Sequence, residues 1–218
     1  MTGNSAQHRP DRHFLAISDS ASLFVPAWKP PACLEYLIGM TGTERPTIVF
    51  VGAANGDSAA KQALFYGMAE RVDFTPRVLS LFSLSDDRPE RMFAGADAIY
   101  IDGGSTRNLL ALMREWRADE ALADSYRAGI PVAGASAGAN LMFEWGLTDS
   151  VLTRIDPLAG LGLIPGTISV HHSTRPDRPA AFEKLMETQP EGAPRYLLKD
   201  GQFAHFQNEE CVQVVDIP

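Results

Sequence analysis

The sequence has little cysteine and no long apolar segment. Cys33 and Cys211 are the 2 cysteines among 218 residues, too few for a disulfide framework or a cysteine-rich zinc cluster. No run approaches the roughly 20 apolar residues that cross a bilayer, so we expect no membrane partner. The first twelve residues, MTGNSAQHRPDR, lack the apolar core of a secretory signal. We therefore expect a cytoplasmic protein.

Basic residues are also in deficit. The chain has 19 Lys and Arg against 27 Asp and Glu, which gives a net charge of −8 at pH 7. Binding to nucleic acid depends on a basic face that neutralises phosphates, so this composition argues against a nucleic-acid partner. It does not exclude a local arginine-lined pocket for a small anion.

The remaining composition is that of an ordinary globular protein. Hydrophobic residues make up 45% of the chain and charged residues 21%, which is typical of a folded domain. The length suits one α/β domain with a substantial core. We expect a flexible polar leader at 1–12 and a single domain over 13–218.

Short apolar runs alternate with amphipathic stretches along the chain. This alternation predicts a three-layer α/β sandwich, with a mostly parallel sheet and helices on both faces. Strands are expected at 13–17, 47–51, 77–82, 98–101 and 131–135, and helices at 32–40, 58–71, 106–116, 118–128 and 137–143.

The texture changes after residue 145. The Gly-, Pro- and Asp-rich stretch 146–166 predicts a long ordered loop, followed by a strand at 167–170 and a helix at 180–188. Three short strands at 195–198, 202–206 and 211–215 then predict a C-terminal antiparallel meander. Its first hairpin would turn at Asp200-Gly201.

The pattern GASAG around Ser136 matches G-x-S-x-G, the nucleophile-elbow motif. A serine on a sharp strand-to-helix turn needs small neighbours, and glycines two residues before and after it remove the clashing Cβ atoms. Its hydroxyl would project at a helix N-terminus, where backbone N–H groups can stabilise an oxyanion. The alternative interpretation is a tight structural turn of small residues.

A nucleophilic serine needs a base, and that base needs an acid that orients it. The pair His171-His172 ends a strand-like run, and alternation would direct one imidazole toward the site and the other away. A metal or a purely structural role is the alternative for this pair. Asp149 is the first candidate for the acid, and Glu144, Asp156 and Asp177 compete with it.

A glycine pair, Gly103-Gly104, lies between the predicted strand AIYI and the helix RNLLALMREW. Glycines at such a junction let backbone N–H groups approach a ligand and supply a second oxyanion donor. The phosphate-binding patterns G-x-x-x-x-G-K-[ST] and G-x-G-x-x-G do not occur there.

These motifs occur in an order that resembles the peptidase E and cyanophycinase family of serine peptidases. The resemblance extends over nearly the whole chain from about residue 13. It depends on AIYIDGGSTRNLL against the family's strand–GGGNT–helix signature, GIPVAGASAGANL against its nucleophile motif, and ISVHH against its strand ending in histidine. Asp102 and Ser105 depart from GGGNT. The resemblance implies a fold similar to class I glutamine amidotransferases, with serine in place of cysteine.

The resemblance also implies roles for individual residues. Ser136 would be the nucleophile, His171 the base and Asp149 the acid, with Glu144 as the alternative because some relatives use glutamate. The amides of Gly104 and Ala137 would form the oxyanion hole, and Gly103 would lie against the substrate. Peptidase E-like enzymes cleave dipeptides with an N-terminal aspartate, whose side chain an arginine holds. Arg175 matches that arginine best, and Arg178 is the other candidate.

We therefore expect a serine peptidase that cleaves short peptides, in particular dipeptides beginning with aspartate, and that needs no metal or organic cofactor. The alternatives are a cyanophycinase-like enzyme, another serine acyl hydrolase such as an esterase or amidase, and a non-catalytic peptide-binding relative. An α/β-hydrolase ranks lower, because the chain leaves little room for strand–helix units between Ser136 and His171. The sequence leaves homodimer formation open.

Overall fold

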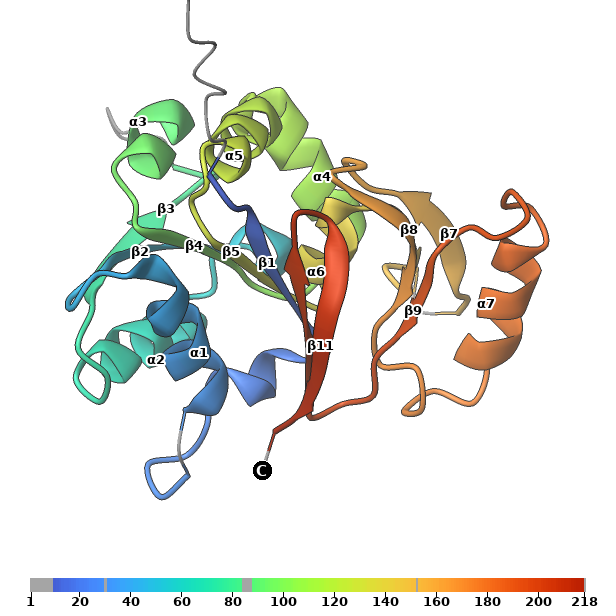
Figure 1. Cartoon of the computed structure of the whole chain (residues 1–218), viewed down its shortest axis with the longest axis horizontal. Coiled ribbons are helices and arrows are strands. Elements are labelled where there is room, and N and C mark those ends of the chain that lie inside the picture. The colour runs from blue at the N-terminus through green and yellow to red at the C-terminus, as the bar shows by residue number, and fades with distance from the viewer. Residues whose placement is uncertain (1–9, 30, 84–87, 152, 218) are drawn as a thin grey trace, which may run out of the picture.

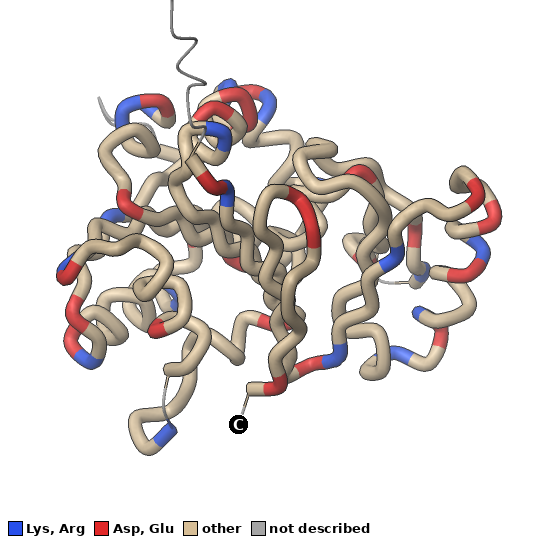
Figure 2. The backbone as a smooth tube through the Cα atoms, viewed as in Figure 1, with Lys and Arg blue, Asp and Glu red and all other residues tan. Residues whose placement is uncertain are grey.

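The computed structural model describes residues 10–29, 31–83, 88–151 and 153–217. Most of the expected leader, residues 1–9, lies outside these ranges. In the described part of the chain, none of the helices combines the length and the apolarity needed to cross a membrane. Figure 2 shows basic and acidic residues interspersed around the periphery rather than gathered in one basic face.

A mostly parallel sheet forms the centre of the molecule (Figure 1). The described strands follow the order β11-β10-β1-β5-β4-β2-β3. The five strands β1-β5-β4-β2-β3 pair in parallel, each with its neighbours in this order. β10 pairs antiparallel with both β1 and β11. The strand bounds are β1 His13–Ile17, β2 Thr47–Val51, β3 Thr75–Leu79, β4 Ala98–Ile101, β5 Val132–Ala135, β10 Gln202–Gln207 and β11 Glu210–Asp216.

Alternating side chains of these strands build a core on each face of the sheet. In β1, Phe14 and Ala16 pack on one face, and Leu15 and Ile17 pack on the other. Helices α3 to α6 cover the first face, while α1 and α2 cover the second. This arrangement confirms the predicted α/β layers. The helix bounds are α1 Ala32–Thr41, α2 Ala59–Ala69, α3 Pro89–Ala94, α4 Thr106–Glu115, α5 Ala118–Arg127 and α6 Ala137–Met142.

A second, smaller sheet stands beside the first, in the order β7-β6-β8-β9. Its strands are β6 Phe143–Thr148, β7 Asp156–Ala159, β8 Ile164–Ser169 and β9 Arg195–Leu197, and α7 Arg178–Met186 joins β8 to β9. The expected loop over 146–166 is therefore wrong, since strand residues occupy much of it. Pro157 argued against a strand at β7 in the sequence, but β7 lies at the edge of its sheet, where proline is tolerated.

The C-terminal strands also differ from the predicted three-stranded meander. β9 pairs in parallel with β8 in the smaller sheet, so Asp200-Gly201 links two sheets instead of closing a hairpin. Only β10 and β11 form the expected antiparallel pair, and Asn208 and Glu209 turn between them. Both have positive φ, 50° and 69°, as in the type I′ turns that suit two-residue hairpin loops.

The junction of β5 with α6 is packed so closely that it requires glycine. A Cβ atom on Gly138 would lie 2.2 Å from the carbonyl oxygen of Ile101 at the end of β4. A Cβ atom on Gly134 would lie 2.3 Å from the carbonyl oxygen of Gly138. The backbone of α6 therefore begins directly against the ends of β4 and β5. This close packing fixes the position of Ser136, which lies midway between the two glycines in the chain.

We expect Gly138→Ala to lower the free energy of unfolding by about 1–3 kcal/mol, because the added methyl group meets backbone atoms that cannot move independently. Gly39→Ala is the matched control. Gly39 lies in α1 with nothing within 4 Å of its Cβ position, so alanine there should raise stability by about 0.5–1 kcal/mol. Urea denaturation measures both. Equal stability of the two variants would contradict the packing argument.

Candidate active site

Ser136 occupies a strained turn between β5 and α6. Its φ of 50° and ψ of −102° fall outside the regions that a serine ordinarily adopts. The backbone is held on both sides, because the Ser136 N–H donates to the Ile17 carbonyl at 2.9 Å and its carbonyl accepts from the Asn140 N–H at 3.0 Å. Such enforced strain is typical of functional positions, and it agrees with the elbow expected from the sequence.

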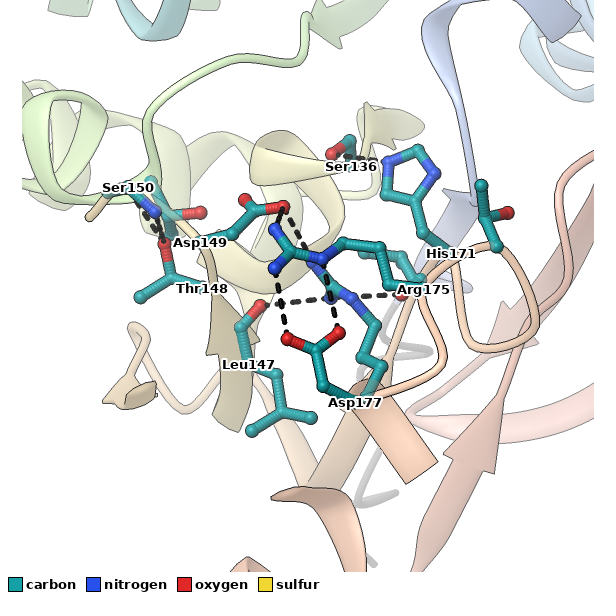
Figure 3. A network of polar contacts seen from close by, with 12 residues as sticks. Ser136, Leu147, Thr148, Asp149, Ser150, His171, Arg175 and Asp177 are labelled. Atoms are coloured by element: carbon teal, nitrogen blue, oxygen red, sulfur yellow. Dashed lines mark hydrogen bonds and ion pairs between the residues drawn. The ribbon is translucent and has the colours of Figure 1, made fainter. Parts of the chain in front are cut away.

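His171 reaches this serine from the smaller sheet. It follows β8, and its Nε2 lies 2.9 Å from the Oγ of Ser136 (Figure 3). The backbone of His171 is also held in a positive-φ conformation, at 53°. Its N–H donates to the Oγ of Ser18 at 2.9 Å. The structure therefore brings together the predicted nucleophile and the predicted base.

The carboxylate beside His171 belongs to Asp200, whereas the sequence analysis had expected Asp149 there. The Oδ1 of Asp200 lies 2.5 Å from the Nδ1 of His171. A carboxylate only accepts hydrogen bonds, so this contact assigns the imidazole proton to Nδ1 and leaves Nε2 free to accept from the serine hydroxyl. Thr174 and Ser18 also donate to Asp200. Burial acts to raise the pKa of Asp200, but these hydrogen bonds and the interaction with His171 lower it overall.

Neither acid proposed from the sequence contacts the imidazole within the described chain. Asp149 instead pairs with two arginines, at 3.3 Å from Arg175 and 3.2 Å from Arg178. Glu144 accepts a hydrogen bond from the Gly166 N–H at 2.7 Å, on the smaller sheet. The prediction that one of these acids orients His171 does not match the geometry.

The two arginines proposed to bind substrate have different environments. Arg175 is partly exposed and forms a two-pronged contact with Asp177, Nε at 3.2 Å and Nη2 at 3.0 Å. Arg178 is only 2% exposed, and its Nη1 donates to the carbonyls of Leu147 and Val170. Burial lowers the pKa of Arg178, while Asp149 counteracts that shift. The prediction that Arg178 contacts a substrate therefore needs correction, because its guanidinium anchors the main chain.

The glycine pair lies beside the serine, as expected. A Cβ atom on Gly103 would lie 3.2 Å from the Cβ of Ser136. Gly104 has a φ of 143°, and a Cβ atom there would lie 2.3 Å from the Ala54 carbonyl oxygen. A larger residue at position 104 would collide with this backbone and displace the turn.

His172 and His205 contact side chains other than Ser136. His172 points away from Ser136, and its ring packs edge-on against Phe182 at 5.8 Å. His205 is only 8% exposed, and its ring nitrogens lie 3.0 Å from the His13 ring and 3.0 Å from the Tyr36 hydroxyl. Among the residues that the structure describes, no group of three or more His, Cys, Asp or Glu side chains is arranged to hold a metal ion.

Comparison with known proteins gives the family. The model of peptidase family S51 matches residues 16–214, which include Ser136, His171 and Asp200. The chain belongs to peptidase family S51. It is therefore a hydrolase that acts on peptide bonds, and its substrate is a peptide. The resemblance noted from the sequence motifs is confirmed.

Relatives of this S51 peptidase include both sequences and structures. It is 35% identical over 181 residues to the uncharacterized peptidase YgaJ of Bacillus subtilis (strain 168), covering 83% of this chain and 78% of that protein. It is 34% identical over 79 residues to peptidase E of Streptomyces coelicolor, covering 35% of this chain and 32% of that protein.

Two crystal structures share its fold. One is a Listeria monocytogenes EGD-e protein described as a candidate peptidase E, with a TM-score of 0.69 at 15% identity, covering 95% of this chain and 100% of that one. The other is a peptidase from an acI-B1 Actinobacterium, with a TM-score of 0.70 at 16% identity, covering 94% and 87%. At these identities the likeness shows the fold alone.

Sequence reasoning on this S51 peptidase missed Asp200 because it assigned the Asp-Gly pair to a hairpin. The structure shows what the sequence does not, namely the parallel pairing of β8 with β9, in which Ser169 lies opposite Leu197. Carboxyl ends of adjacent parallel strands meet at one sheet edge, so residues that follow β8 and β9 lie close together. This pairing, once known, points to an acid shortly after β9.

Arg178→Met should lower the free energy of unfolding of this S51 peptidase by about 2 kcal/mol, because it removes the guanidinium that donates to the Val170 carbonyl. Arg154→Met is the matched control, since Arg154 also pairs with an aspartate but is 64% exposed. Its loss should cost at most about 1 kcal/mol. Urea denaturation compares the two, and an Arg178→Met protein as stable as the control would contradict the anchoring role.

Proposed function

We propose that this S51 peptidase cleaves short peptides with Ser136 as nucleophile, His171 as general base and Asp200 as the acid that orients the base. One observation carries the proposal: the imidazole lies 2.9 Å from the serine oxygen on one side and 2.5 Å from the carboxylate on the other. This arrangement is the one that activates a serine hydroxyl.

The mechanism follows from these contacts. His171 Nε2 takes the hydroxyl proton while the Ser136 oxygen attacks the peptide carbonyl. Asp200 keeps the Nδ1–H tautomer in place and stabilises the imidazolium that forms. The imidazolium then protonates the leaving amine, and the C–N bond breaks to give an acyl-enzyme. Finally His171 activates a water molecule, which hydrolyses the ester and restores Ser136.

Two backbone amides are available for the oxyanion of the tetrahedral intermediate. Ala137 is the first residue of α6, so its N–H has no carbonyl partner within that helix. The N–H of Gly104 makes no hydrogen bond with any residue that the structure describes. Both belong to turns packed against Ser136, which supports their assignment to the oxyanion hole.

For the substrate, we propose dipeptides with an N-terminal aspartate, held by Arg175. This guanidinium lies in the segment just after His171 and is 34% exposed. It already faces Asp149 and Asp177, and Asp177 is the more exposed of the two, at 52% against 41%. A substrate carboxylate would take the place of Asp177 and accept from the Nε and Nη2 donors along the edge of the Arg175 guanidinium.

Substitution of the two aspartates separates the candidates for the orienting acid. Ser136→Ala should abolish hydrolysis, and Asp200→Asn should lower kcat by about 10⁴-fold because the imidazole loses its required tautomer. Asp149→Asn should keep kcat within about tenfold of the wild type. Steady-state kinetics on a panel of dipeptides measures all three. A larger loss in Asp149→Asn than in Asp200→Asn would refute the assignment.

The proposed competition between Asp177 and the substrate carboxylate for Arg175 gives a second test. Arg175→Gln should raise KM for Asp-Leu by about tenfold or more, the loss of a charge-assisted pair, and leave Ala-Leu hydrolysis nearly unchanged. Asp177→Asn should instead lower KM for Asp-Leu, since it removes the internal competitor. The ratio of kcat/KM for the two dipeptides is the readout. Unchanged ratios in both variants would exclude the aspartate preference.

A further inference from the structure

A buried carboxylate lies directly behind the glycine pair. Asp102 follows β4, and its side chain is fully buried. Three groups donate to it, namely Ser20 Oγ at 2.6 Å, Tyr100 Oη at 2.8 Å and Asn55 Nδ2 at 2.8 Å. The ammonium group of Lys61 lies 4.0 Å away. A buried acceptor of this kind must be satisfied by donors, and here the donors come from three different segments of the chain.

Two of these donors also hold the backbone of Gly103. The Ser20 hydroxyl donates to Asp102 and accepts from the Gly103 N–H at 3.3 Å. The Asn55 amide donates to both Asp102 and the Gly103 carbonyl, the latter at 3.1 Å. Its orientation is unambiguous, because its Oδ1 accepts from the Ser58 N–H at 3.1 Å. Gly103 is thus hydrogen-bonded at both its N–H and its C=O.

The bond to the carbonyl fixes the direction of the next amide. The described chain contains no cis peptide bond, and in a trans peptide the C=O and the following N–H point in opposite directions. Because the Gly103 carbonyl points to Asn55, the Gly104 N–H points away from Asn55. Glycine resists peptide rotation less than other residues do, so without these partners the Gly103–Gly104 peptide could turn over.

We propose that Asn55 and Ser20, held in place by Asp102, are positioning residues that keep the Gly104 N–H directed at the substrate oxyanion. The inference rests on the proposed serine mechanism and adds the device that orients one of its two donors. None of the three side chains touches the reacting atoms in this arrangement. They act through the peptide between Gly103 and Gly104.

The test compares Asn55→Ala and Ser20→Ala with Tyr100→Phe. The first two variants remove bonds to Gly103, whereas Tyr100→Phe removes a bond to Asp102 and leaves the glycine peptide untouched. We expect kcat to fall about 10- to 100-fold in the first two, less than the roughly 100- to 1,000-fold loss of a whole oxyanion donor. KM should stay within about twofold, because a donor used only in the transition state does not alter ground-state binding.

A peptide aldehyde supplies a readout that a merely structural role would not change. It forms a tetrahedral adduct with the serine, so its affinity should fall in parallel with kcat in Asn55→Ala and Ser20→Ala. Tyr100→Phe should keep both kcat and aldehyde affinity at wild-type values, even if the lost hydrogen bond lowers the urea concentration at which the protein unfolds. Wild-type kcat in both Asn55→Ala and Ser20→Ala, or a loss of kcat as large in Tyr100→Phe, would overturn the inference.

Failure of the underlying mechanism has a separate signature. A fluorophosphonate probe should label the wild-type protein at Ser136 and should not label Ser136→Ala. If the wild type is labelled while Asn55→Ala and Ser20→Ala keep full activity, only the positioning role is wrong. If Ser136→Ala still hydrolyses peptides, both the mechanism and the positioning role are wrong.

Discussion

The contact between Ser136 and His171 joins residues from two different sheets. It therefore depends on the packing that holds the two sheets in a fixed relative position. The main sheet supplies the serine, and the smaller sheet supplies the histidine and Asp200. No linker separates α6 from β6, since one ends at Met142 and the other begins at Phe143. Phe143 then packs against Phe14 and Phe206 of the main sheet, with ring centroids 6.1 and 5.3 Å apart. The aromatic cluster therefore packs the first strand of the smaller sheet against the main sheet.

Local patterns in the sequence were enough to predict the parallel strands of the main sheet and to single out Ser136 and His171, which the structure brings within 2.9 Å of each other. The buried strands 13–17, 47–51 and 98–101 have the bounds expected from their apolar runs. Ser136 was recognisable because its elbow requires small residues that are adjacent in the chain. His171 was recognisable from the doublet at a strand end, with the choice between its members taken from family resemblance.

The features that could not be predicted depend on long-range pairing. Asp200 meets His171 only because β9 pairs with β8, and short strands of this kind carry no signal of their partner. Arg178 was a candidate for substrate binding, yet it is buried, and its Nη1 and Nη2 atoms donate to two carbonyls and to Asp149. The burial of His205 likewise depends on His13 and Tyr36, which come from distant parts of the chain.

The parallel β8–α7–β9 unit has a consequence for which parts of this chain tolerate a change of length. His171 and Asp200 follow its two strands, and α7 lies between them in the chain. The pairing of β8 with β9 holds these two side chains together, while the segment from Arg175 through α7 contributes nothing to that pairing. A change of length in that segment would therefore alter the surface near Arg175 and leave the contact between His171 and Asp200 in place.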